Sequence, residues 1–341
     1  MVKHHLFWPL TFLAALLVFN FIYSPDFFSI RMRDGHLYGS LIDILNFGAP
    51  LMIVSIGMTL VIAATKGVDL SVGSVVAIAG AIACLNISKG DGSIANVIVA
   101  VGTALLISIV LGVWNGLLVA SVGIQPIIAT LILMVSGRGV SQLITSGQII
   151  TVSNPNYKFI GAGSLLTLPF SIFIVAIVFL IAFLLTRKTA LGLFIESVGC
   201  KPTASRLAGI KSKTVMFFVY MFCSLCAGVA GLLLSSNVSS ADGNNAGLWV
   251  ELDAILSVVI GGTSLNGGRF YLGGTVVGAL IIQTLTTTIY MIGVPPEITL
   301  VVKAFVVLIV CLIQSEAFRK SHAFRWKTRS YPAEKEVKQH A

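Results

Sequence analysis

Long apolar runs constrain what this chain can fold into more than any other feature of its sequence. Hydrophobic residues fill 56% of the 341 positions and charged residues only 10%, against about 25% charged residues in soluble domains. The apolar residues gather into runs long enough to cross a bilayer, about 18 residues or more. We therefore predict an all-α, polytopic integral membrane protein.

Ten runs are candidate spans. The first follows Lys3 and has no small-x-small cleavage site after it, so we interpret it as an uncleaved helix rather than a signal peptide. The ten predicted transmembrane helices cover residues 6–23, 44–64, 71–88, 95–121, 127–145, 169–186, 214–235, 247–262, 271–292 and 297–315.

Lysine and arginine concentrate in two segments separated by four of these spans. Segment 187–213 carries six of them against one acid, and the tail after residue 315 carries seven. Because short cytoplasmic loops are enriched in Lys and Arg, we place both segments, and the N-terminus six spans earlier, in the cytoplasm. The predicted organisation is a transmembrane domain over residues 1–316 and a basic cytoplasmic tail over 317–341. The net charge of +9 follows from this bias and does not indicate nucleic-acid binding, because no basic stripe alternates with aromatic residues.

Two acids, Glu251 and Asp253, precede the apolar run that ends in "GGTSLNGG" (261–268). If the run is a full span, they lie about 16 Å and 13 Å from its cytoplasmic end, deep in the membrane. If it is a half-span that begins near Leu248, both fall in its first turn, where the helix dipole favours acids. In either case they face protein or water, because a charge exposed to lipid there costs about 2.5–3.5 kcal/mol.

Five further polar residues lie within predicted spans and are candidates for a substrate pathway, together with the two acids. Lys303 is a candidate partner for Glu251 or Asp253. The alternative for all of them is a structural role, because polar side chains often hold membrane helices together. The five residues are Asn46, Asn115, Arg138, Gln142 and Lys303.

Sequence signatures of enzymes are absent. The chain has no H-E-x-x-H, no G-x-S-x-G and no clustered metal ligands. Gly262 and Gly267 have the spacing of a phosphate-binding loop, but Gly268-Arg269 follows where Lys and Ser or Thr are required. We therefore predict no enzyme activity, metal or cofactor in this chain, and any ATP that drives it must bind another subunit.

The chain also repeats one pattern. Residues 61–81 and 259–279 each run from apolar residues through a glycine-containing turn to apolar residues, and many transporters contain internal repeats. Chance glycine spacing is the alternative that we favour.

Four blocks resemble the permeases of bacterial ribose-type ABC sugar importers. They are "GVDLSVGS" (67–74), "WNGLLVASVGIQPIIATLI" (114–132), "GRGV" (137–140) and "ELDAILSVVIGGTSLNGGRF" (251–270). The resemblance extends from about residue 42 to residue 314. Three further stretches are most similar to the galactofuranose-type permeases: "DGHLYGSLIDILN" (34–46), "RKTALGLFIESVG" (187–199) and "NNAGLWVELDAIL" (244–256). The chain departs from the family at Lys66, where a glycine is usual.

The resemblance implies partners. A periplasmic binding protein would deliver the sugar, two permease chains in the inner membrane would form the pore, and separate ATPase subunits would bind ATP and Mg. The galactofuranose-type system implies that the second permease is a related but different chain. Segment 187–213 resembles the cytoplasmic loop that docks into the ATPase, with Glu196, Arg206 and Gly209 as candidate contacts; an ordinary basic loop is the alternative.

The sequence thus favours a permease subunit of an ATP-driven importer that moves a pentose or a furanose-form sugar, such as galactofuranose, by alternating access. The main alternative is a secondary sugar transporter that uses Glu251 or Asp253 for ion coupling. A membrane scaffold without transport activity is the third hypothesis.

Overall fold

The computed structural model describes residues 7–33, 36–295, 298–305 and 308. Twelve α-helices have defined bounds, and residues 298–305 are also helical. The helices are α1 (Phe7–Tyr23), α2 (Ser40–Thr65), α3 (Val72–Lys89), α4 (Ile94–Gly116), α5 (Pro126–Thr145), α6 (Pro155–Ala162), α7 (Phe170–Arg187), α8 (Leu191–Cys200), α9 (Pro202–Leu207), α10 (Ser212–Val238), α11 (Val250–Ile260) and α12 (Leu272–Met291). A short 3-10 turn, η1 (Pro25–Phe28), follows α1, and a π-helical turn, η2 (Leu117–Val122), prolongs α4.

The predicted all-α class is confirmed. Among the described residues, seven helices are long and apolar enough to cross a membrane, namely α2, α3, α4 with η2, α5, α7, α10 and α12. Each of these seven coincides with a predicted span. α1 matches the first predicted span but has 17 residues, and α11 has only 11. The tenth span is described only through residues 298–305 and 308, and the tail 317–341 lies outside the described residues.

Helix α2 is the centre of the bundle, and nearly all of its residues after Asn46 are buried. It packs along α10, where a side chain at Gly57 would stand 2.8 Å from the Cys223 backbone. α10 in turn packs on α3, where a side chain at Gly231 would stand 2.3 Å from the Val76 carbonyl oxygen. Glycine at both positions lets the helix backbones approach closely, as is common in membrane bundles. Cys223 and Cys226 are buried along this contact and pack as small apolar side chains.

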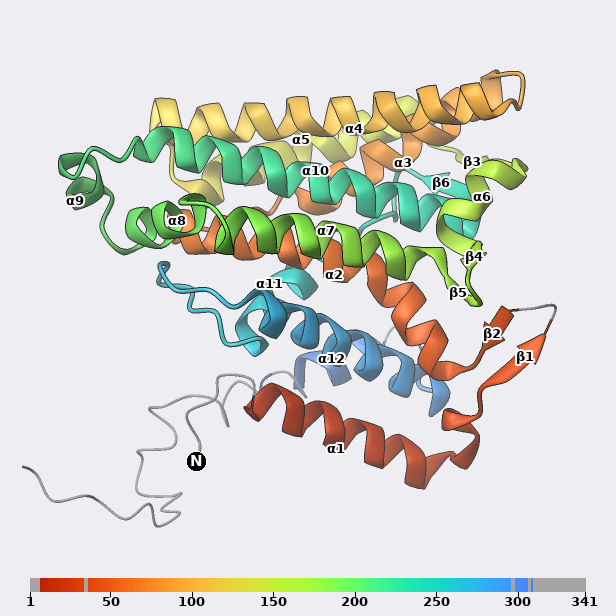
Figure 1. Cartoon of the computed structure of the whole chain (residues 1–341). Coiled ribbons are helices and arrows are strands. Elements are labelled where there is room, and N and C mark those ends of the chain that lie inside the picture. The colour runs from red at the N-terminus through yellow and green to blue at the C-terminus, as the bar shows by residue number, and fades with distance from the viewer. Residues whose placement is uncertain (1–6, 34–35, 296–297, 306–307, 309–341) are drawn as a thin grey trace, which may run out of the picture.

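The two ends of the bundle differ in structure (Figure 1). One end carries α8, α9 and the turn between α11 and α12. The other end carries α6 and three two-stranded antiparallel ladders. The ladders pair β1 (Arg31–Arg33) with β2 (His36–Tyr38), β3 (Ile149–Thr151) with β6 (Ser240–Asp242), and β4 (Ser164–Leu165) with β5 (Leu168–Pro169). We continue to expect the α8–α9 end in the cytoplasm, from its excess of lysine and arginine.

Two segments inside the bundle are not helical. Residues 66–71 lead from α2 back into the bundle before α3 begins, and the Asp69 amide reaches the Met58 sulfur, 3.4 Å away and about two turns before the end of α2. Residues 243–249 form turns between β6 and the start of α11, in which Gly243 and Gly247 are buried while the side chains of Leu248 and Trp249 are exposed. Irregular backbone at this depth is tolerated only where protein or a wet cavity surrounds it.

The repeated pattern in the sequence corresponds to a helix end, a turn and a helix start in both places. The second turn, 261–271, reaches the end of α2: the Gly268 amide donates to the carbonyl oxygen of Ala63, 2.9 Å away, and a Cβ atom at Gly267 would stand 2.7 Å from the Lys66 Cγ atom. Lys66 ends α2 with φ of +57°, a left-handed conformation that glycine adopts most readily.

Candidate functional site

Helix α11 begins inside the bundle rather than at its surface. Gly247 and Trp249 both have positive φ, +67° and +66°, and this left-handed pair turns the chain into the helix. Eleven residues make about 16 Å of helix, roughly half of the 30 Å hydrocarbon core. The full-span interpretation of residues 247–262 is therefore wrong. The half-span interpretation holds, and both acids lie in the first turn of α11.

Glu251 is the more buried of the two acids, with 3% of its surface exposed. It points toward the start of α3, where a side chain at Gly73 would stand 2.2 Å from Glu251 Oε2 and 2.5 Å from the Gly247 carbonyl oxygen. Oε2 has no hydrogen-bond partner among the described residues. The first turns of α3 and α11 thus meet around this carboxylate, and the partial positive charge of helix N-termini favours it there.

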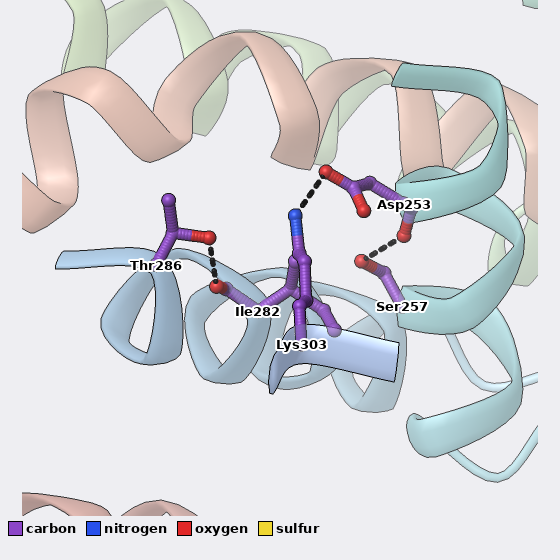
Figure 2. Close-up of polar contacts among 5 residues, drawn as sticks. All are labelled: Asp253, Ser257, Ile282, Thr286 and Lys303. Atoms are coloured by element: carbon purple, nitrogen blue, oxygen red, sulfur yellow. Dashed lines mark hydrogen bonds and ion pairs between the residues drawn. The ribbon is translucent and has the colours of Figure 1, made fainter. Parts of the chain in front are cut away.

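Asp253 points away from Glu251 and forms an ion pair with Lys303 of the 298–305 helix. Figure 2 shows the two side chains directed at each other, with 2.5 Å between Nζ and Oδ2. The Asp253 side chain is 23% exposed and that of Lys303 is 12% exposed. The Ser257 hydroxyl donates to the Asp253 backbone carbonyl over 2.7 Å. The two acids therefore belong to different contacts, as their spacing of two residues on a helix requires.

Arg138 holds the inner end of segment 243–249 against α5. Its guanidinium donates to the Ala246 carbonyl oxygen over 2.6 Å, which satisfies a backbone acceptor that no helix serves. Glu251 and Asp242 are the negative charges that act on this guanidinium. Arg138 and Glu251 thus lie on two sides of the segment from which α11 starts, without an ion pair between them among the contacts of the described residues.

The remaining predicted pathway residues lie apart from this centre. Asn46 accepts a hydrogen bond from the Ser171 hydroxyl, 2.6 Å away, which joins α2 to α7. Asn115 is fully buried and donates to the Ser71 hydroxyl over 2.8 Å. Gln142 is exposed on α5. The structure therefore brings together Arg138, Glu251, Asp253 and Lys303 around α11, while Asn46 and Asn115 join helices.

Asp69 is a site residue that the sequence reasoning missed. Its side chain is fully buried, and Oδ1 accepts from the Ser71 amide at 3.0 Å and the Ser71 hydroxyl at 2.6 Å. Asn115 also lies 3.5 Å from Oδ1. These bonds fix the segment before α3, and so place Gly73 against Glu251. The sequence contains a signal for this turn, because an aspartate two residues before the serine at a helix start, here Asp69 and Ser71, is a local turn pattern.

The predicted docking segment forms α8 and α9 at one end of the bundle. Glu196 is half-buried, whereas Arg206 and Gly209 are exposed. Gly209 has φ of +83° and is the second residue after the end of α9. Leu207, which the sequence reasoning did not single out, is 92% exposed beside Arg206. Leu207 and Arg206 are thus both accessible on the segment that the sequence predicts to dock.

Comparisons with known proteins identify the family of the chain. A family model for the permease component of branched-chain amino acid transport systems matches residues 40–311. The chain is 49% identical to the galactofuranose transporter permease protein of Escherichia coli K12 over 321 residues, which are 93% of each chain. It is 38% identical to the fructose import permease protein of Bifidobacterium longum over 98% of this chain and 94% of that one. It is also 38% identical to the ribose import permease protein of Escherichia coli K12, over 89% and 92%. No solved structure gives a significant match. The resemblance seen in the sequence is thereby confirmed.

The Asp253–Lys303 pair generates a prediction about stability. Lys303→Met should destabilise the protein in detergent by about 1–3 kcal/mol, because it leaves the largely buried Asp253 carboxylate without its partner. The double variant Asp253→Asn/Lys303→Met should recover most of this loss, because neither charge remains. Thermal unfolding of both purified variants measures the difference. Equal stability of Lys303→Met and the unmodified protein would show that the ion pair does not form.

Proposed function

Because the chain belongs to the family of permease components of branched-chain amino acid transport systems, we propose that it is the membrane-spanning permease of an ATP-driven importer in the bacterial inner membrane and that its substrate is a pentose or a furanose-form sugar. The relatives at 38% to 49% identity are sugar permeases, for galactofuranose, fructose and ribose. All three names describe transport subunits rather than enzymes. The observation that carries the sugar assignment is the 49% identity over 93% of both chains.

ATP and Mg bind a partner subunit in this proposal, and a periplasmic binding protein delivers the sugar. The Gly-rich turn supports the first point, because Gly268-Arg269 replaces the residues that a phosphate-binding loop needs. The turn has a structural role instead: it joins α11 to α12 and bonds to α2 through Gly268. Galactofuranose is the sugar that we favour, from the relative with 49% identity.

The substrate pathway in this proposal passes the sides of α5 and α11 that carry exposed polar groups. Ser136 and Gln142 are exposed on α5, and Asp253 is 23% exposed on α11. A face with exposed polar groups at this depth is poorly suited to lipid, because polar groups there lose their hydrogen-bond partners. Leu143 on the same helix is 80% exposed and supplies apolar contact area.

A second permease chain covers this face and closes the pathway. The chain by itself leaves the face open, and an oligomeric pore satisfies both its polar and its apolar residues. The resemblance to galactofuranose-type systems supports a second chain that is related but not identical. Lipid contacts the other exposed surfaces, which α4 and α7 supply with large apolar side chains.

A secondary transporter is the alternative, with Glu251 as the coupling carboxylate. The specific observation in its favour is that Glu251 Oε2 is buried without a hydrogen-bond partner among the described residues, as a proton-carrying group would be. The two mechanisms differ in their energy source, so a transport measurement separates them.

Uptake into proteoliposomes tests the function. The chain is reconstituted with its candidate partner permease, ATPase and binding protein, and labelled galactose, fructose, ribose and leucine are offered. We expect uptake of one or more sugars that requires ATP and persists when an uncoupler removes the proton gradient. Leucine, the substrate class in the family's description, should not enter. Uptake that stops with the uncoupler while ATP is constant would contradict the ATP-driven mechanism, and uptake of leucine alone would contradict the sugar assignment.

The exposed end of α9 gives a separate prediction about the ATPase partner. Leu207→Asp should lower co-purification of the ATPase by about tenfold, because a charge replaces an apolar contact at the centre of the docking surface. Leu166→Asp is the matched control, since Leu166 is 80% exposed but lies between β4 and β5 at the opposite end. Equal ATPase binding by the two variants would place the docking surface elsewhere.

A further inference from the structure

Three segments that are distant in the sequence meet at the α8–α9 end of the bundle. They are the end of α2, the end of α8 and the turn that links α11 to α12. The Gly268 amide donates to the Ala63 carbonyl oxygen over 2.9 Å, an acceptor near the end of α2. Gly267 and Gly268 have φ of +74° and +88°, and this left-handed pair directs the amide toward α2.

Gly199, in the last turn of α8, fits between the other two segments. A Cβ atom at this position would stand 1.8 Å from the Ala63 carbonyl oxygen and 2.6 Å from the Gly268 nitrogen. Both neighbours are backbone atoms and cannot turn away as a flexible side chain can. Only glycine therefore allows α8 to seat against the hydrogen bond that joins α2 to the turn.

Two further contacts bind the docking segment to the same junction. Lys66, at the end of α2, donates through Nζ to the Cys200 carbonyl oxygen over 3.1 Å. The Arg187 guanidinium, at the end of α7, lies 5.9 Å from the centre of the buried Phe270 ring, within the range of a cation–π contact. The docking segment is thus attached to the turn at its start, through Arg187 and Phe270, and to the end of α2 at its middle, through Cys200 and Lys66.

The turn is rigidly joined to α11. The amides of Gly261, Gly262 and Thr263 donate to carbonyl oxygens of the last turn of α11, at 2.9–3.2 Å. The Thr263 hydroxyl then accepts from the Tyr271 amide at the start of α12, 3.1 Å away. A displacement of the turn would therefore displace α11, whose last residue lies about 14 Å along the helix axis from Glu251.

We propose that Gly199 is the coupling contact between the ATPase and the substrate pathway. When the ATPase moves α8, the backbone contact of Gly199 with Gly268 transmits the movement to the turn. Helix α11 then transmits it to Glu251 and to the Asp253–Lys303 pair. Gly199 is a positioning residue in this account and touches neither sugar nor nucleotide. The proposal rests on the proposed function, because it assumes that the 187–213 segment binds the ATPase.

The account separates two roles within the docking segment. The exposed side, with Arg206 and Leu207, binds the ATPase. The buried side, with Gly199, transmits movement. A substitution on the exposed side should abolish ATPase binding. A substitution on the buried side should leave ATPase binding and ATP hydrolysis intact but lower the transport that each hydrolysis event drives.

Gly199→Ala tests the buried side. In proteoliposomes that contain the whole complex, we expect normal co-purification of the ATPase and normal ATP hydrolysis. Uptake of labelled galactose, ribose or fructose, whichever the unmodified complex imports, should fall by about tenfold per ATP hydrolysed, within the usual range for coupling between two sites. Gly102→Ala is the control, because a Cβ atom there meets nothing within 4 Å.

Gly268→Ala is the second variant and lies outside the docking segment. Its Cβ atom would stand 2.8 Å from the Cys200 sulfur, on a backbone with φ of +88°. If Gly199→Ala fails to assemble, this variant decides the question. A normal ratio of uptake to ATP hydrolysis in assembled variants would overturn the proposal. An unmodified complex that shows no ATP-dependent uptake would instead overturn the proposed function, so the two failures are distinguishable.

Discussion

The structure depends on how it satisfies the backbone polar groups of two non-helical segments inside an apolar bundle. An amide or carbonyl group without a partner costs several kcal/mol in lipid, and helices avoid this cost by bonding to themselves. Residues 66–71 form no such ladder, and residues 243–249 form only isolated turn bonds, such as that from the Leu248 amide to the Asn245 carbonyl oxygen. Asp69 and Ser71 bond the first segment, and Arg138 bonds the second through the Ala246 carbonyl. These side-chain bonds allow α3 and α11 to begin in the interior.

The consequence is a polar centre that an ordinary helical bundle would not have. The first turns of α3 and α11 meet at Gly73 and Glu251, and Asp253 on the other side of α11 pairs with Lys303. Transporters commonly bind their substrates where interrupted helices meet near the middle of the membrane. The same short helix that carries the acids ends at the turn held by Ala63 and Gly199, so one element of 11 residues links the docking end to the centre.

Most of the fold could be predicted from the sequence, because apolar runs report directly which segments cross a bilayer. Seven of the ten predicted spans are helices of full length. The sequence also left the half-span open for α11, because acids at 251 and 253 suit a first turn better than a span interior. It could not decide the matter, since the break before α11 depends on Arg138, more than 100 residues away. For Asp69, the local pattern with Ser71 predicts a turn, but its burial follows from contacts with Met58 of α2 and Asn115 of α4 that no local pattern contains. Only the contacts in the structure distinguish candidate residues with a structural role from those near the site. Asn46 joins α2 to α7, whereas Lys303 lies beside Asp253.

In the proposed mechanism, the inner end of α11 borders a water-filled pathway rather than lipid. Thiol labelling tests it most directly, with a membrane-impermeant reagent, in an assembled complex whose native cysteines are replaced. Leu252→Cys, beside Asp253 on α11, is compared with Leu180→Cys, midway along α7; the two side chains are 45% and 53% exposed. The account predicts rapid labelling at 252, altered by ATP, and none at 180. Equal labelling at the two positions, or none at either, would contradict it.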